Sequence, residues 1–307
     1  MVRTVRVETG KIIRGVGGKY EILCGDTLYS ARARGVFRHE QISPEVGDAI
    51  ALRLGESGEG YIEQILPRKN LLIRPPLANL DLMLICASAA KPAPALSTLD
   101  KLSAICVHSD ISPVFIVTKS DIDAEASARL SRIYSQSGFR TFEVSSLSGK
   151  GIDAVRAFLS ETLSEKTAAL AGASGVGKST LLNLLFPGFG LATGDVSEKI
   201  ARGRHTTRHV ELFPALGGLI ADTPGFSMLD FMRFDFMEVS DLANAFPEFA
   251  PYLGTCRYAD CTHLREEGCS VVEAVRDGKI EKSRHESYVE LYTVLKDKKA
   301  WQKPPRF

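Results

Sequence analysis

The segment GASGVGKST, residues 172–180, constrains the fold of this chain more than any other feature. Gly172, four further residues, and then Gly177, Lys178 and Ser179 complete the phosphate-binding P-loop pattern. An apolar, strand-like run (TAALAG) precedes the pattern, and a helix-like run follows it. The structural alternative is a glycine-rich turn with a chance Lys-Ser pair. Strand, loop and helix in this order favour a nucleotide site instead.

The chemistry of a P-loop assigns roles to its residues. The glycines let successive backbone N–H groups face a phosphate, and the following helix N-terminus adds a favourable dipole. We expect Lys178 to bridge the β- and γ-phosphates and the Ser179 hydroxyl to coordinate Mg²⁺. The residues expected to contact nucleotide are Gly172, Ala173, Ser174, Gly175, Val176, Gly177, Lys178, Ser179 and Thr180.

A second phosphate-side motif is DTPG, residues 222–225, at the end of another apolar run. Alone it is a common turn sequence. After a P-loop, it predicts that Asp222 reaches the metal and that the Gly225 N–H contacts the γ-phosphate. Between the two motifs lies RGRHTT, and we expect either Thr206 or Thr207 to be the switch threonine that binds Mg²⁺.

The residue after DTPG bears on hydrolysis. Many GTPases place a glutamine there to orient the attacking water, but this chain has Phe226. An apolar side chain cannot hold that water, so slow turnover is expected unless another group helps. Residues 188–208 have no clean period, which predicts a mobile loop, and His205 within it is the hypothetical group that aligns the water.

The tetrapeptide TKSD, residues 118–121, follows the apolar run SPVFIVT. It resembles the Asn-Lys-x-Asp motif that GTPases place after such a strand. That resemblance implies that Asp121 hydrogen-bonds guanine and that Lys119 packs over the base. Thr118 departs from the usual Asn: it keeps a hydroxyl that can tie this loop to the P-loop backbone, but it loses an amide. Some loss of affinity is therefore expected. A P-loop ATPase is the alternative, against which Asp121 argues.

The order of the motifs differs from that of a conventional GTPase. Ser145 and Ser146, after the run FEV, match the further base-side loop of that superfamily, so both base motifs precede the P-loop. A sheet requires neighbouring strands rather than a particular starting point, so such an order is physically allowed. The sequence therefore predicts a circularly permuted GTPase domain.

A cluster of soft metal ligands lies near the C-terminus, in the pattern C-x4-C-x-H-x5-C. Three thiolates and one imidazole suit one tetrahedral, structural Zn²⁺, and four protein ligands leave no open position for catalysis. Reduced, unliganded thiols are the alternative. The expected ligands are Cys256, Cys261, His263 and Cys269. The other three cysteines, Cys24, Cys86 and Cys106, stand alone in apolar runs and are expected in the core.

The N-terminal part has the pattern of a small β-barrel. Five short strand-like runs alternate with turn-rich stretches over about the first 66 residues. An oligonucleotide-binding (OB) barrel fits this pattern, and an SH3-like barrel would leave a similar one. We predict an all-β OB-like barrel over 1–68, an α/β permuted P-loop GTPase domain over 69–230 and a helical zinc-binding domain over 231–307.

Alternating strands and helices are expected in the central domain. The predicted strands include 209–213 and 217–223 in a parallel sheet, and the predicted helices cover 98–108, 124–137, 151–163 and 178–186. In the C-terminal domain, helices are expected over 238–249 and 280–299.

Composition limits the classes of binding partner that are expected. The net charge is +1 with a predicted pI near 7.6, so no global field attracts nucleic acid or anionic lipid. No run reaches the roughly 18 apolar residues of a membrane span, and we expect a cytoplasmic protein, monomeric and without a membrane partner. Local RNA contacts are predicted at Arg32, Arg34 and Arg38 of the barrel and in the tail KDKKAWQKPPRF.

Taken in order, the barrel, the permuted motifs (GASGVGKST, RGRHTT and DTPGF) and the C-x4-C-x-H-x5-C cluster resemble the bacterial ribosome-small-subunit-dependent GTPase A (RsgA/YjeQ) family. The resemblance implies a late assembly factor that binds GTP, GDP, the 30S ribosomal subunit and 16S rRNA. It also implies 30S-stimulated hydrolysis followed by release, with the catalytic histidine at His205. An RNA-binding scaffold that is gated by nucleotide and has negligible turnover is the alternative.

Overall fold

The computed structural model describes residues 6–35, 37, 42–55, 59–73, 75–187, 210–222 and 237–297. The chain divides into two compact units. The first comprises Met1–Leu82, Leu159–Leu170 and Val196–Phe226, and the second comprises Met83–Phe158, Ala171–Asp195 and Ser227–Phe307. Across these described ranges, no helix is both long and apolar enough to cross a membrane.

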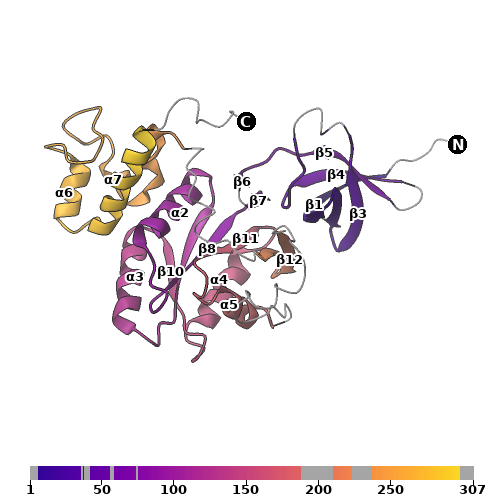
Figure 1. Cartoon of the computed structure of the whole chain (residues 1–307), viewed down its shortest axis with the longest axis horizontal. Coiled ribbons are helices and arrows are strands. Elements are labelled where there is room, and N and C mark those ends of the chain that lie inside the picture. Colours follow the sequence, from indigo (N-terminus) through magenta and orange to yellow (C-terminus); the bar gives the residue numbers. More distant parts are fainter. Residues whose placement is uncertain are drawn as a thin grey trace. The chain divides into compact units, whose positions relative to one another are not determined.

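The first unit begins with a closed five-stranded barrel (Figure 1). Its strands are β1 (Arg6–Val16), β2 (Lys19–Cys24), β3 (Thr27–Ala33), β4 (Ala49–Leu54) and β5 (Gly60–Ile65). The long β1 pairs with both β2 and β4, while β5 pairs with β3 and β4, so the ring closes. Alternate residues point inward, and Ile12, Ile22 and Ile62 are fully buried. The predicted OB-like barrel is confirmed.

The same unit carries three further strands beside β1. These are β11 (Thr167–Ala171), β12 (Glu211–Ala215) and β13 (Gly218–Asp222). β11 and β13 are parallel, but β12 runs antiparallel to β13, so the parallel arrangement predicted for 209–213 is wrong. Only Leu216 and Gly217, both with positive φ, separate β12 from β13, and a link this short permits a hairpin but no parallel crossover. β12 also pairs with β1 at Glu211 and Arg14.

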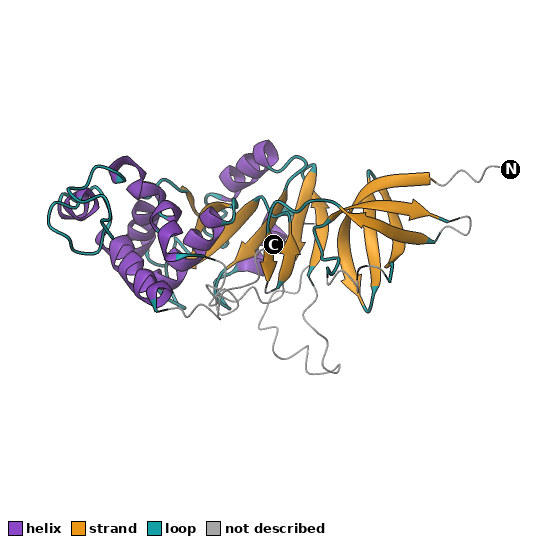
Figure 2. Ribbon diagram, turned by 90° about the horizontal axis from the view of Figure 1, so that it is seen from above, coloured by secondary structure: helices purple, strands orange, loops and turns teal. Residues whose placement is uncertain are grey.

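The second unit contains strands β8 (Leu82–Ser88), β9 (Ser112–Thr118) and β10 (Arg140–Glu143), in the order β10-β9-β8. Every residue of β8 is buried, as expected for a strand covered on both faces. The helices are α2 (Leu96–His108), α3 (Ala124–Gln136), α4 (Ile152–Thr162) and α5 (Lys178–Leu185), close to the predicted spans. Figure 2 shows these helices in purple beside the orange strands.

The C-terminal module differs in part from expectation. Residues 238–249, predicted as one helix, instead form short 3₁₀ turns: η3 (Val239–Asp241), η4 (Ala243–Ala245) and the start of η5 (Pro247–Tyr252). Pro247 lies within the predicted range and lacks the N–H that an α-helix interior needs, so one continuous helix cannot span it. Helix α6 (Ser270–Arg276) and the hairpin β6 (Leu71–Ile73) with β7 (Pro76–Ala78) were not predicted. Helix α7 (Lys282–Lys296) lies within the predicted 280–299.

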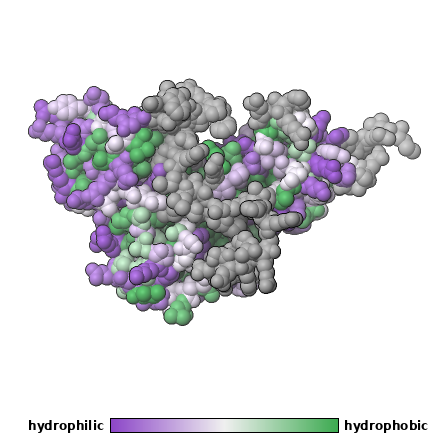
Figure 3. Space-filling model, in the orientation of Figure 1, coloured by the Kyte–Doolittle hydropathy of each residue, from purple (hydrophilic) through white to green (hydrophobic). Residues whose placement is uncertain are grey.

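Exposed apolar side chains are interspersed with polar ones on the face that Figure 3 shows. Among the most exposed is Leu147, at 89% relative accessibility. Cys24, Cys86 and Cys106 are buried, as predicted.

Candidate nucleotide and metal sites

The P-loop between β11 and α5 has the backbone conformation that its glycines predict. Gly172, Gly175 and Gly177 have φ values of +149°, +77° and +101°. A Cβ on Gly172 would lie 2.5 Å from the carbonyl oxygen of Cys86, which excludes any larger residue. Gly177 is the N-cap of α5, so the first free N–H groups of this helix follow the loop directly. The arrangement can cradle a phosphate.

The Lys178 ammonium lies over its own loop. Its Nζ donates hydrogen bonds to the carbonyl oxygens of Gly172 at 2.7 Å and Ala173 at 2.9 Å. An ammonium group has three donors, so one remains for a phosphate oxygen. Burial lowers the pKa of Lys178, and the nearby Cys86 acts in the opposite direction.

A hydrogen bond joins the TKSD loop to the P-loop. Thr118 is 3% exposed, and its Oγ1 donates to the carbonyl oxygen of Val176 at 2.7 Å across 58 residues of sequence. This is the tie between the two loops that the sequence predicts for the threonine hydroxyl. Lys119 adopts a positive φ of 58°, and its Nζ donates to the carbonyl oxygen of Lys91 at 2.5 Å. Asp121 is exposed.

The second base-side loop lies beside the first. β9 and β10 are parallel, with Glu143 opposite Val117, so their carboxyl ends meet at one edge of the sheet. The Ser120 N–H donates to the carbonyl oxygen of Val144 at 3.1 Å, which links the two loops directly. Ser145 is fully buried and its Oγ accepts from the Ser148 N–H at 3.1 Å, whereas Ser146 is partly exposed.

The remaining residues predicted on the phosphate side lie wholly or partly outside the described part of the chain. Asp222 is the last residue of β13, but its side chain lies outside the described atoms. His205, Thr206, Thr207, Gly225 and Phe226, and the predicted loop over 188–208, lie outside the described residues.

The four predicted metal ligands converge. The ligand atoms of Cys256, Cys261, His263 and Cys269 all lie within 4.8 Å of one another. His263 Nδ1 lies 3.5 Å from the sulfurs of Cys256 and Cys269, which are themselves 3.9 Å apart. Around a tetrahedral Zn²⁺, with bonds of about 2.3 Å to sulfur and about 2.0 Å to nitrogen, the nitrogen–sulfur and sulfur–sulfur separations would be roughly 3.5 and 3.8 Å. The donor set therefore fits a tetrahedral metal.

Hydrogen bonds outside the cluster hold its ligands in place. His285 Nε2 lies 2.7 Å from the carbonyl oxygen of His263, a residue whose own φ is +61°. The Glu266 carboxylate accepts from the N–H groups of Thr262, Leu264 and Arg265. Burial alone would raise the pKa of Glu266, but a hydrogen bond from the Thr262 hydroxyl and further bonds from backbone N–H groups outweigh it and lower the pKa to about 2. The loop between Cys261 and Cys269 is thus preformed around a carboxylate.

Comparison with known proteins identifies the family of this chain. The profile of the RsgA GTPase matches residues 65–232, and that of the RsgA N-terminal domain matches residues 9–62. This chain belongs to the RsgA family. Proteins described as small ribosomal subunit biogenesis GTPase RsgA from Geobacillus kaustophilus and Bacillus subtilis are each 38% identical to it, over 94% of this chain and 98% of theirs.

Solved RsgA-like structures agree with the fold. The crystal structure of YloQ, described as a circularly permuted GTPase, aligns with a TM-score of 0.78 at 33% identity, covering 100% of this chain and 99% of that one. The crystal structure of YjeQ from Thermotoga maritima aligns with a TM-score of 0.80 at 30% identity, covering 96% and 100%. This RsgA-family chain is accordingly a GTPase with a circularly permuted domain, and a GTPase of this kind uses Mg²⁺ with GTP.

Two residues that support these sites were not predicted from the sequence. The Lys91 backbone, which holds Lys119, gives no signal because any residue offers a carbonyl. Glu266 could have been suspected, since an acid between two predicted metal ligands can accept hydrogen bonds from the loop.

Proposed function

We propose that this chain is a GTPase whose nucleotide cycle times its residence on the small ribosomal subunit. The observation that carries the proposal is the hydrogen bond from Thr118 to Val176. It supports one nucleotide site assembled from motifs in permuted order, with the base loops against the phosphate loop. The printed names of the relatives, which describe small-subunit biogenesis, support the choice of partner.

Within that site, we assign guanine recognition to Asp121, packing over the base to Lys119, and backbone contacts to the loop of Ser145 and Ser146. The phosphates lie on the P-loop residues 172–180, and Gly225 contacts the γ-phosphate. Ser179, Asp222 and either Thr206 or Thr207 hold Mg²⁺. His205 aligns the attacking water, because Phe226 cannot. GTP and GDP are the expected nucleotides.

The cysteine cluster is assigned to one structural Zn²⁺. Soft thiolates with an imidazole favour zinc over the harder cations, and four protein ligands close the coordination shell. Zinc here orders the C-terminal module rather than supplying chemistry.

The remaining assignments concern partners and organisation. The barrel over 1–68 and the zinc domain over 231–307, which precede and follow the GTPase domain over 69–230 in the sequence, contact 16S rRNA of the 30S subunit. The protein acts as a monomer in the cytoplasm and leaves the subunit after hydrolysis. Arg32 and Arg34 are exposed on the barrel, as phosphate contacts require. Arg38 and most of the basic tail lie outside the described residues.

A multiple-turnover assay of phosphate release, with and without purified 30S subunits and with ATP as a control, tests the function. We expect GTP-specific release that the subunit stimulates. Lys178→Ala should lose roughly 100-fold or more of the stimulated rate, because a phosphate-binding cation is removed. Lys166→Ala, at an exposed lysine of the GTPase domain outside the nucleotide loops, is the matched control and should keep the full rate.

Two outcomes would redirect the proposal. Tight GTP binding to the 30S complex without phosphate release would favour the nucleotide-gated RNA-binding scaffold instead. A His205→Ala variant that keeps full stimulated turnover would remove His205 from the mechanism while leaving the GTPase in place.

A further inference from the structure

A lysine of the barrel reaches a strand of the GTPase domain. Lys11 lies in the middle of β1, where it is opposite Leu23 of β2 and Ala49 of β4. Its Nζ donates a hydrogen bond to Oγ1 of Thr167, the first residue of β11, at 3.0 Å across 156 residues of sequence. Both residues belong to the first compact unit. A side-chain hydrogen bond therefore joins the barrel to the strand that leads into the P-loop.

The start of β11 is also held by Asp81, the residue before β8. The Thr167 N–H donates to Asp81 Oδ2 at 2.8 Å, and the Asp81 N–H donates to the Thr167 carbonyl oxygen at 2.8 Å. Thr167 is fully buried, and with Lys11 at its hydroxyl every polar atom of the residue has a partner. A buried residue whose polar atoms are all paired has a closely defined position.

The ammonium of Lys11 has lost part of its contact with water. Burial lowers the pKa of Lys11, the charge of Asp81 acts in the opposite direction, and the charge of Lys69 lowers the pKa further. Lys69 in turn donates to the second oxygen of Asp81, at 2.5 Å. A charged donor that is partly withdrawn from water makes a stronger hydrogen bond than an exposed one. The bond from Lys11 is thus a substantial constraint on Thr167.

The position of Thr167 affects both phosphate-side motifs. β11 and β13 are parallel, with Thr167 opposite Leu219. The P-loop begins at Gly172, directly after β11, and β13 ends at Asp222. Every residue of β11 is buried, and a closely packed interior transmits strain. A displacement of Thr167 would therefore move the P-loop and the expected metal ligand together.

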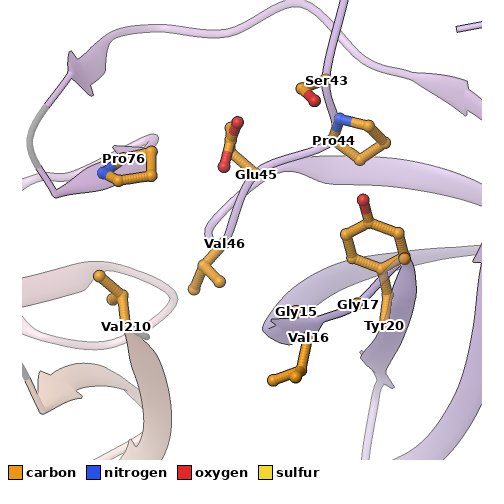
Figure 4. A pocket seen from close by; sticks show the side chains of 11 residues that line it. Gly15, Val16, Gly17, Tyr20, Ser43, Pro44, Glu45, Val46, Pro76 and Val210 are labelled. Atoms are coloured by element: carbon orange, nitrogen blue, oxygen red, sulfur yellow. The ribbon is translucent and has the colours of Figure 1, made fainter. Parts of the chain in front are cut away.

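Another contact of β1 with these strands is weaker. Arg14 is opposite Glu211 of β12, and their ion pair spans 3.8 Å between side chains that are 46% and 36% exposed, so it contributes little. A cavity of about 200 Å³, the barrel pocket, lies beside β1 and the residue before β12 (Figure 4). Its lining includes Val16, Tyr20, Glu45 and Val210. The Lys11 bond is therefore the better candidate for transmitting a displacement of the barrel.

We propose that Lys11 is a positioning residue for GTP hydrolysis, which passes a displacement of the barrel to the P-loop through Thr167. The described contacts of Lys11 include none of the residues assigned to the nucleotide or to Mg²⁺, so its effect is exerted through β11. A shift of about 1 Å in a group that positions a substrate can change a rate by roughly 100-fold. The inference rests on the proposed function, because the small ribosomal subunit is the partner expected to engage the barrel.

The size of the effect is limited by the contribution of one hydrogen bond, which corresponds to a factor of roughly two to ten. Stimulation is the ratio of kcat with saturating 30S subunits to kcat without them. Lys11→Met should lower this ratio by roughly two- to tenfold, because methionine keeps most of the side-chain length but cannot donate. The subunit concentration for half-maximal stimulation should not change, because Lys11 is not itself assigned to the partner.

Phosphate release over a series of 30S concentrations measures both quantities. Lys19→Met is the matched control, at an exposed barrel lysine on the neighbouring strand β2. If Lys19 contacts the subunit, its loss raises the half-maximal concentration, but the maximal stimulation should stay that of the wild type. A residue that only binds the partner and a residue that transmits the partner's effect are thus distinguished by which of the two quantities changes.

Substitutions at the acceptor test the same hydrogen bond from its other end. Thr167→Val keeps the shape of the side chain and removes the hydroxyl, so it should lower stimulation as Lys11→Met does. Thr167→Ser keeps the hydroxyl and should retain most of the stimulation. The double variant should lose no more than the stronger single variant, because both substitutions remove one bond. The two threonine variants also test the inference if thermal unfolding shows that Lys11→Met folds poorly.

Several results would overturn the inference. They are unchanged stimulation in Lys11→Met or Thr167→Val, additive losses in the double variant, or an equal loss of maximal stimulation in Lys19→Met. If the wild type is stimulated and Lys11→Met is stimulated equally, the inference fails and the proposed function stands. If 30S subunits do not stimulate the wild type, the proposed function itself fails, and this inference fails with it.

Discussion

Replacing Arg284 should weaken the attachment of helix α7 far more than any surface change on the same helix. Its guanidinium is fully buried and donates to Asp100 Oδ1 at 2.8 Å and to Glu248 Oε1 at 2.6 Å. Ser103 and Ser287 complete the group, the latter donating to Asp100 Oδ2 at 2.6 Å. Burial alone would lower the pKa of Arg284, but the two acids reverse this and keep it protonated.

The size of the destabilisation follows from the two buried carboxylates that the substitution leaves without a cation. Arg284→Met keeps most of the side-chain volume but leaves Asp100 and Glu248 buried without their cation. Removing one partner of a buried ion pair costs about 3–5 kcal/mol. It also removes the contacts of the guanidinium carbon with the rings of Phe246 and Phe139, at 4.6 and 5.4 Å from their centroids. Because about 1.4 kcal/mol changes an equilibrium constant tenfold, the equilibrium constant for local opening should rise by a factor of roughly 100 to 3,000.

Hydrogen exchange of the α7 amides measures that opening directly. Lys282→Ala on the same helix is the matched control: its partner is Glu286, and the two side chains are 82% and 63% exposed. An exposed pair of this kind contributes at most about 0.5 kcal/mol. Adding Asp100→Asn to Arg284→Met should recover part of the loss, because one orphaned charge is removed. If Arg284→Met exchanges no faster than Lys282→Ala, the assigned role of the buried pair is wrong.

Three further predictions concern the nucleotide loops, the metal and the barrel pocket. Thr118→Val should weaken GDP binding roughly tenfold, because the buried carbonyl of Val176 loses its partner; Thr118→Ser should not, and calorimetric titration distinguishes them. Cys261→Ala should abolish bound zinc and lower the melting temperature, as measured by metal analysis and thermal unfolding; a zinc content near zero in wild-type protein purified without chelator would contradict the assignment. Burial raises the pKa of Glu45 above its ordinary 4.5, so the neutral carboxyl is favourable to the folded state at acidic pH, and this stability is lost as the pH rises through the raised pKa. Glu45→Gln should therefore gain thermal stability relative to the wild type from pH 4.5 upward. A difference in melting temperature that stays constant across pH would refute this.

Much of the architecture could be predicted because its signals are local. The barrel strands alternate with turn residues, and the P-loop and the cysteine cluster are short patterns whose spacing carries their chemistry. The prediction of one helix over 238–249 is wrong because Pro247 lacks the N–H that a helix interior needs. The predicted parallel direction of 209–213 is wrong because Leu216 and Gly217 form a two-residue turn, which joins antiparallel strands.

Contacts between residues that are far apart in the sequence could not be predicted from it. Arg284 finds Asp100 across 184 residues and Glu248 across 36, and each lies in a segment where a charged residue would ordinarily face solvent. Nothing in their spacing indicates that all three are buried together. The barrel pocket has the same origin, because Glu45 and Tyr20 come from separate segments and only the closed barrel brings them to one cavity.

The permuted order leaves the nucleotide site intact but changes what its elements are joined to. Helix α2 begins soon after Lys91, whose carbonyl holds Lys119 of the base loop, and the same helix supplies Asp100 to Arg284 of the C-terminal module. In the chain itself, that module follows the motif expected to sense the γ-phosphate. The module is thus tied to the base side through a buried ion pair and to the phosphate side through the backbone. If the proposed nucleotide contacts are correct, we expect a change at either end of the nucleotide to reach the C-terminal module, so we expect nucleotide state to alter a partner contact of that module.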